Sequence, residues 1–236
     1  SFLGYIAMKA LGTERGTLLA ILAGGLVSST ATTHSLARAG RGLPELHRSL
    51  AAGVLLASTV MAPRVVVIGV AVEPRLLVPL GIPMGLVALA GIATVAVLAR
   101  GSRKAPPPAV QSANPFALGM AIKLALAIAV VILLSRALYQ WLGDAGLLIV
   151  STISGVTDVD AVTVSSSRLV REGASIALAT GSVLVAVLSN TIAKTAYVAS
   201  IAGGPMARLV ALGFLLQILV GAAGLAVVVR LTAGGG

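Results

Sequence analysis

The chain has 236 residues, of which 58% are hydrophobic and 10% are charged, and its mean hydropathy is +1.05. Water-soluble domains rarely exceed one half apolar residues, so this composition excludes an ordinary soluble domain and predicts an all-α polytopic integral membrane protein. Basic loops at a membrane surface explain the net charge of +10 without nucleic-acid binding. No cysteine is present, which excludes disulfides and thiolate metal sites.

Apolar blocks follow one another along the chain, and most are long enough for a membrane span of about 20 residues. They cover residues 2–11, 16–37, 49–70, 76–99, 116–139, 145–167, 174–201 and 206–229. A basic, Pro-rich segment interrupts them, and its three consecutive prolines cannot be helical. We therefore predict a first membrane repeat at 1–100, a linker at 101–115 and a second membrane repeat at 116–236. Each repeat has about four transmembrane helices, or alternatively three. Apolar sequence begins at once, so we expect Ser1 to be a truncation or processing boundary.

The two halves contain similar motifs. "GLVSSTATTHSLAR" at 25–38 aligns without a gap with "GVTDVDAVTVSSSR" at 155–168, an offset of 130 positions. The identical pairs are Gly25/Gly155, Ala31/Ala161, Thr33/Thr163, Ser35/Ser165 and Arg38/Arg168. The same offset aligns Arg64 with Lys194, and one inserted residue then aligns Pro74 with Pro205. This shared register predicts homologous halves that arose by duplication.

Basic residues predict the topology. Loops after the second, fourth, sixth and eighth blocks carry Arg38, Arg41, Arg48, Arg100, Arg103, Lys104, Arg168, Arg171 and Arg230. The opposite loops carry Arg15, Arg75 and Arg208. We expect a multi-pass protein of the cell membrane whose basic loops and linker are cytoplasmic. Four spans per half would make the repeats parallel, and three would invert them.

Two acids lie inside the sixth block. At 1.5 Å per residue from position 145, Asp158 would be about 20 Å inside a hydrocarbon core about 30 Å thick. A carboxylate at that depth costs at least ~2.5 kcal/mol, so Asp158 and Asp160 should face a cation, a cavity or a basic partner. Two readings stay open: an ion or proton site, and an internal salt bridge for which Lys194 is a candidate.

Side chains two positions apart on a regular helix point about 200° apart, so both acids bind one ion only if the helix is broken. Gly155 and its β-branched neighbours favour a break, as do Gly24 and Gly25 in the first half. We predict a broken motif helix in each half and oxygen-only ligation suited to Mg²⁺, Na⁺, Ca²⁺ or Mn²⁺. The predicted ligands are Asp158, Asp160, Ser28, Thr30, Thr157, Thr163 and Asn190.

Each of these side chains also has a structural explanation that needs no ion site. The hydroxyls could bond back to their own helix, and Asn190 could form a hydrogen bond between helices. Arg64 and Lys194 could snorkel to the interface, pair with an acid, or act as tethered cations that compete with the substrate. Pro63 should kink its span.

The pair "GGLVSSTATTHSLAR" and "GDAGLLIVSTISGVTDVDAVTVSSSRL" resembles the membrane domain of unknown function that follows MgtC/SapB-type domains in bacterial and archaeal proteins. The resemblance covers nearly all of the chain. It implies a helical membrane fold and an MgtC/SapB-type domain on the N-terminal side. It implies little chemistry, because the association with magnesium homeostasis comes through MgtC.

These features predict a carrier or channel for a cation, such as Mg²⁺, with a midplane site at the interface of the two repeats. One alternative is a non-transporting scaffold or sensor for an MgtC-like protein, and another is a carrier of a small anionic or organic substrate. No nucleophile–base pair or phosphate-binding glycine loop is evident, so we expect neither an enzyme nor a cofactor beyond a bound cation. Expected partners are the transported ion, the lipid bilayer, an MgtC/SapB-type domain and a second copy in a homodimer, but not nucleic acid.

Overall fold

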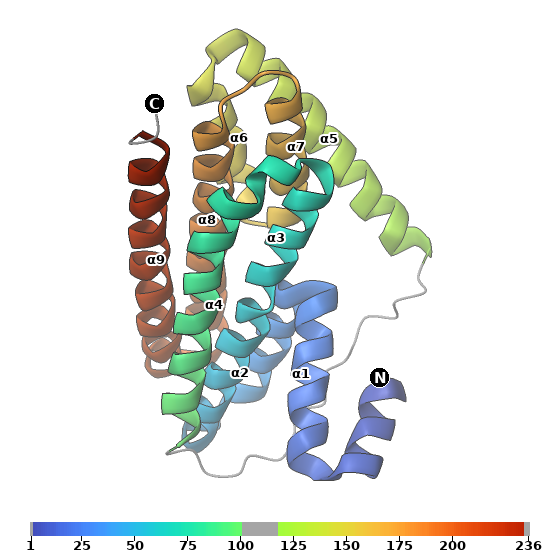
Figure 1. The fold of residues 1–236 in the computed structure, drawn as a ribbon. Helices are drawn as coiled ribbons and strands as arrows, with labels where there is room; N and C mark the ends of the chain where they lie inside the picture. The colour runs from blue at the N-terminus through green and yellow to red at the C-terminus, as the bar shows by residue number, and fades with distance from the viewer. Residues whose placement is uncertain (1, 101–117, 234–236) are drawn as a thin grey trace. The chain divides into compact units, whose positions relative to one another are not determined.

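The computed structural model describes residues 2–100 and 118–233, and these ranges are helical with no strand. In chain order the elements are α1 (Phe2–Gly40), η1 (Pro44–Leu46), α2 (His47–Thr59), α3 (Met61–Val72), η2 (Pro74–Leu76), α4 (Leu77–Ala99), α5 (Leu118–Leu142), α6 (Asp144–Gly155), α7 (Val159–Arg171), α8 (Ile176–Ala202) and α9 (Gly204–Ala233) (Figure 1). The prediction of an all-α protein is confirmed. The predicted linker at 101–115 lies outside the described residues.

Within the described residues, four segments are long and apolar enough to cross a membrane: Pro44–Val72, Pro74–Ala99, Ile176–Ala202 and Gly204–Arg230. Ile128–Leu142 and Asp144–Gly155 are shorter apolar helices. Large apolar side chains remain exposed on the long segments, including Val67 on α3 and Leu212 on α9, at 67% and 65%. Lipid rather than water is the solvent that suits such surfaces, so the chain is a membrane protein.

The helices form two compact units. Unit 1 contains Ser1–Met61, Ala88–Phe116 and Lys194–Gln217, and unit 2 contains Ala62–Val87, Ala117–Ala193 and Ile218–Gly236. The core of unit 1 includes Leu36, Leu55, Val198, Met206 and Phe214, which come from α1, α2, α8 and α9. In unit 2, Leu147, Leu169 and Ala174 pack together against Tyr139 and Leu178. Each unit therefore combines segments from both sides of the predicted linker.

The two motif segments differ in continuity. α1 runs unbroken through Gly24 and Gly25, so the prediction of a broken motif helix in each half is wrong for the first half. A Cβ on Gly25 would lie 2.8 Å from the carbonyl oxygen of Ala57. Gly25 thus permits a close helix crossing rather than a break. In the second half, α6 ends at Gly155 and α7 begins at Val159.

A milder irregularity lies between α2 and α3. The assigned helix is interrupted at Val60 alone, three residues before Pro63, and Val60 keeps helical angles of φ −62° and ψ −24°. Proline has no N–H to donate to the carbonyl of the residue four positions earlier, here Thr59, and its ring crowds that carbonyl. The irregularity therefore lies in the turn that precedes Pro63, and the kink expected from Pro63 stays a prediction.

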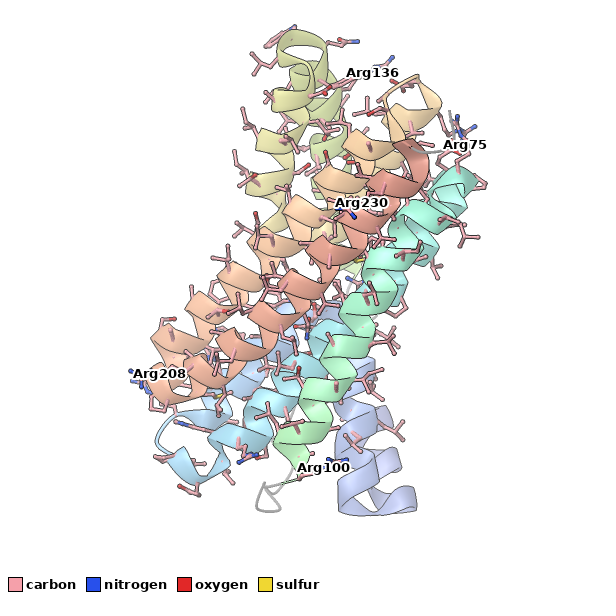
Figure 2. All side chains as sticks on the ribbon, turned by 60° about the vertical axis from the view of Figure 1, so that its left-hand side comes forward. Arg75, Arg100, Arg136, Arg208 and Arg230 are labelled. Carbon is pink, nitrogen blue, oxygen red and sulfur yellow. The ribbon has the colours of Figure 1, made fainter. Side chains whose placement is uncertain are left out.

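The helix ends do not follow the alternation expected from charge. In unit 1, Gly40 packs against Met206, and Arg48 Nε donates to the carbonyl oxygen of Leu98 at 3.1 Å. Arg100 and Arg208, which were expected on opposite sides, therefore lie at the same end of unit 1 (Figure 2). Residues 2–11 and 16–37, which were expected to form two spans, are both assigned to α1.

The same departure occurs in unit 2. Arg75 Nη2 lies 3.5 Å from the carbonyl oxygen of Val170, beside Arg171, although Arg75 and Arg171 were expected on opposite sides. In this unit the turn between α3 and α4 therefore lies against the end of α7.

An acidic side chain fixes the turn that precedes α4. Glu73 accepts from the Arg75 backbone N–H at 3.1 Å and from Arg75 Nε at 2.8 Å. The Arg75 side-chain hydrogen bond, and then the backbone one, lower the pKa of Glu73 from 4.5 to about 2. A carboxyl group whose pKa is lower in the folded state stabilises the fold above the unfolded pKa. That contribution is lost as pH falls through the folded pKa.

We expect Glu73→Gln to lower the Tm slightly at pH 7, because Arg75 is largely exposed and surface pairs contribute little. The difference from wild type should shrink as pH falls from about 4.5 toward 2. Thermal melting of detergent-purified protein across this range measures it. Glu45→Gln, at an exposed acid on η1, is the matched control. A Tm difference that is equal at pH 7 and at the acid limit contradicts the role of the ion pair.

Candidate functional site

The candidate site surrounds the interruption between α6 and α7. Asp158 is in an extended conformation, with φ −153° and ψ 131°, and its carboxylate accepts from the Asp160 N–H at 3.1 Å. It is the N-cap of α7, a role for which Asp is well suited. Gly155 ends α6 against α8, where a Cβ would lie 2.6 Å from both Cα and O of Ala186. Asn190 Nδ2 donates to the Gly155 carbonyl at 2.9 Å. The interruption is thus fastened to α8.

Asp160 pairs with Arg64 in unit 2. The distance from Asp160 Oδ2 to Arg64 Nη2 is 3.0 Å, and the two side chains are 22% and 21% exposed. The salt bridge expected as one alternative is therefore present, with Arg64 in place of Lys194. An internal pair of this kind satisfies both charges in a medium that solvates neither well.

Two oxygen acceptors near the interruption have no hydrogen-bond partner within the described ranges. They are Oδ1 of Asp160 and Oδ1 of Asn190, and both atoms are buried. Nearly all buried polar groups in proteins have a partner, so unpartnered ones call for an explanation. Carboxylate and amide oxygens are good ligands for hard cations such as Mg²⁺, Ca²⁺ and Na⁺.

Three of the remaining predicted ligands, Thr163, Thr157 and Ser28, make local hydrogen bonds. Thr163, which is fully buried, donates to the Val159 carbonyl at 2.9 Å, and Thr157 donates to the Ser154 carbonyl at 3.0 Å. These are the back-bonds expected as the bland alternative, although each hydroxyl oxygen can still accept. Ser28 Oγ accepts from the Ala31 N–H at 3.2 Å.

The predicted ligand set spans both units. Asp158, Asp160, Thr157, Thr163 and Asn190 belong to unit 2, whereas Ser28 and Thr30 lie on α1 in unit 1. A joint site that uses both groups therefore stays a prediction. Among residues 2–100 and 118–233, no group of three or more His, Asp or Glu residues could hold a metal ion. Any cation site here must draw on amide, hydroxyl and carbonyl oxygens as well as on acids.

Lys194 occupies a different environment, in unit 1. Its side chain is fully buried, and its ammonium donates to Ser29 Oγ at 2.9 Å and to Ser58 Oγ at 3.2 Å. Full burial rules out snorkelling to an interface. The predicted ligand set omitted Ser29 and Ser58. The alignment of Lys194 with Arg64 is the sequence signal that could have linked Lys194 to a motif helix.

Further buried hydroxyls line α7, and hydropathy gave no sign of them. Ser165, Ser166 and Ser167 are all buried, and Ser135 Oγ on α5 donates to Ser165 Oγ at 3.1 Å. The hydroxyl oxygens of Ser166 and Ser182 have no hydrogen-bond partner in the described part of unit 2. The buried residues of α7 thus include four hydroxyl side chains, Thr163 and Ser165 to Ser167, among apolar ones such as Val162 and Leu169. Small hydroxyl residues of this kind allow close packing between membrane helices.

Comparison with known proteins identifies the family. A family model for a domain of unknown function, DUF4010, matches residues 1–202. An uncharacterized protein of Aquifex aeolicus (strain VF5) is 29% identical over 195 residues, which cover 80% of this chain and 84% of that protein. No solved structure matches the chain. Because the family model matches most of the chain, including α1, α6 and α7, the protein belongs to the DUF4010 family.

Proposed function

We propose that the protein is a membrane carrier for a cation and that Asp160 is its central ligand. The observation that carries the proposal is the state of this carboxylate. One oxygen binds Arg64, and the other is buried without a hydrogen-bond partner in the described structure. A carboxylate with one oxygen on an internal guanidinium and the other oxygen available as a ligand is suited to exchange the guanidinium for an incoming cation.

In the proposed cycle the guanidinium of Arg64 is a built-in competitor. When no ion is bound, Arg64 neutralises Asp160. An incoming cation takes its place with Oδ1 of Asp160 and Oδ1 of Asn190 as ligands. Asp158, two positions from Asp160, supplies the second negative charge that a divalent ion such as Mg²⁺ requires. The backbone leaves the helix between Gly155 and Val159, so its carbonyls there can complete the shell.

The packing of α4 on α9 supports homologous halves. Small residues bring the two helices together within each unit. The facing pairs are Gly91 with Gln217 and Thr94 with Gly213 in unit 1, and Val87 with Gly221 and Pro83 with Gly224 in unit 2. An offset of 130 converts Gly91 into Gly221 and Val87 into Gln217, so the pairs in one unit map onto those in the other. This is the pattern that a duplicated chain with twofold pseudosymmetry produces.

The same pairs support inverted repeats. Within each unit, later residues of α4 face earlier residues of α9: Pro83 faces Gly224 and Val87 faces Gly221 in unit 2, and Gly91 faces Gln217 and Thr94 faces Gly213 in unit 1. The two helices, which the offset makes equivalent, are therefore antiparallel. Equivalent helices that run in opposite directions require a pseudo-twofold axis perpendicular to them, which is the three-span alternative. Inverted repeats with interrupted helices are typical of secondary transporters, in which the repeats move against each other. This favours a carrier over a channel.

A scaffold or sensor function beside an MgtC/SapB-type domain is the second candidate. The Asp160–Arg64 pair favours it as well, because an ion pair can be purely structural. The resemblance to domains that follow MgtC/SapB-type domains is the reason to propose that partner. The two candidates differ in whether an ion crosses the membrane.

Flux through purified protein in liposomes tests the proposal. We expect at least one of Na⁺, K⁺, Mg²⁺, Ca²⁺, Mn²⁺ and H⁺ to cross at a saturable rate. Asn190→Ala should weaken the apparent affinity about tenfold, equivalent to ~1.4 kcal/mol, because it removes one oxygen ligand. Asp144→Asn, at an exposed acid that begins α6, is the control and should leave flux unchanged. Absence of flux for every ion would overturn the carrier and favour the scaffold.

A further inference from the structure

Lys194 is one of the largest fully buried side chains in the described structure. It lies inside the candidate span Ile176–Ala202, where an ammonium is costly unless polar groups receive it. Two hydroxyl oxygens from two different helices receive it: Ser29 Oγ of α1 at 2.9 Å and Ser58 Oγ of α2 at 3.2 Å. All three residues belong to unit 1.

These two serines differ from the hydroxyl residues beside them. Thr33 Oγ1 donates to the Ser29 carbonyl and Thr59 Oγ1 donates to the Leu55 carbonyl, each at 2.8 Å, which is the usual arrangement in membrane helices. The oxygens of Ser29 and Ser58 instead converge on one positively charged atom. Convergent oxygens from separate helices around a single positive centre have the geometry of a cation site.

The sequence alignment relates this cluster to the pair in unit 2. The offset of 130 aligns Lys194 with Arg64, and it aligns Thr30, the neighbour of Ser29, with Asp160. Each basic side chain thus reaches the same turn of a motif segment. In unit 2 that turn offers a carboxylate, whereas in unit 1 it offers hydroxyls.

We infer that unit 1 contains a second cation site, formed by the hydroxyl oxygens of Ser29 and Ser58 and filled by the chain's own Lys194. The ligand class is a primary alkylammonium, supplied in cis. Two neutral hydroxyls bind a free metal ion only weakly. A metal ion therefore does not displace the tethered ammonium, which keeps the site occupied. A consequence follows that rests on the proposed carrier function: in each chain only the site in unit 2 exchanges its bound cation with solution.

Chemical rescue tests the inference. Lys194→Ala removes the ammonium and most of its stem, and the variant should melt at a lower temperature than wild type. Propylammonium at about ten times its Kd should raise the Tm of Lys194→Ala by about 2–4 °C and leave wild type unchanged. Propanol, which has a similar shape and no charge, should not. The triple variant Ser29→Ala/Ser58→Ala/Lys194→Ala should lose the rescue, and Lys194→Met, whose side chain fills the space, should show none.

Equal stabilisation by propanol, rescue in the triple variant, or no rescue in Lys194→Ala would each overturn the inference. If Lys194→Ala does not accumulate, it is produced with propylammonium in the medium. Recovery of folded protein then supports the site, and failure to recover it counts against the site. Because the readout is stability, the rescue can succeed or fail independently of flux. If wild type shows no flux, the carrier proposal is contradicted, and the result of the propylammonium rescue still holds.

Discussion

Asp160→Asn should stop cation flux and lower the free energy of unfolding by about 2–3 kcal/mol. The substitution leaves the Arg64 charge inside the bundle without its carboxylate, and breaking a fully buried pair in this way costs about 3–5 kcal/mol. The expected value is smaller because the two side chains keep 21% and 22% of their exposure. Thermal or denaturant unfolding in micelles gives the stability, and flux in liposomes gives the activity.

Adding Arg64→Gln to Asp160→Asn separates transport from scaffolding. The double variant has no stranded charge, so most of the lost stability should return while flux stays absent. Arg64→Gln alone removes the competing guanidinium, so the carrier mechanism expects this variant to bind the cation with higher apparent affinity.

In Asp158→Asn the amide oxygen can still cap α7, so stability should change little. Full flux in Asp160→Asn would remove Asp160 from the site.

Gly155→Ala should destabilise the protein by about 1–3 kcal/mol, the range for overpacking a tight interior. The new Cβ would lie 2.6 Å from Cα and O of Ala186, and backbone atoms cannot move aside as a flexible side chain can. Separating α6 from α8 would also strain the bond from Asn190 to the Gly155 carbonyl. We therefore expect a weaker apparent cation affinity as well as a lower Tm.

Gly181→Ala on α8 is the matched control for Gly155→Ala. Nothing lies within 4 Å of a Cβ at Gly181, so alanine should stabilise that helix by about 0.5–1 kcal/mol through its better helix propensity. The two substitutions therefore change Tm in opposite directions. A Gly155→Ala protein as stable as wild type would show that α6 and α8 are not in close contact at this point.

The helices were predictable because the signal for them is local. The apolar runs within the described ranges form helix apart from short interruptions, and the one at Val60 lies in the turn that precedes Pro63. The role of Gly25 was not predictable from its neighbours. Glycine serves both where a helix breaks and where two helices touch. The partner that decides between them, Ala57, lies on the next helix, α2, 32 positions further along the chain.

The partner of Asp160 illustrates the same limit in the site. Arg64 and Lys194 are aligned with each other and have similar apolar surroundings in the sequence, so both were candidates. Which one meets Asp160 depends on how helices from the two halves pack, and no local pattern records that. The sequence left the number of spans in each half, and with it the relative direction of the halves, open for a related reason. Residues 2–11 and 16–37 are separate apolar blocks in the sequence, and both belong to α1.

The exchange of basic residues between halves bears on how the protein is assembled during synthesis. The ammonium of Lys194 reaches a serine 165 positions earlier, and the guanidinium of Arg64 waits for an acid of the second half. Contacts of such separation form late, since most of the chain must already be inserted. Until translation passes α8, the nascent chain therefore holds ionic and hydroxyl groups that only its later part can cover.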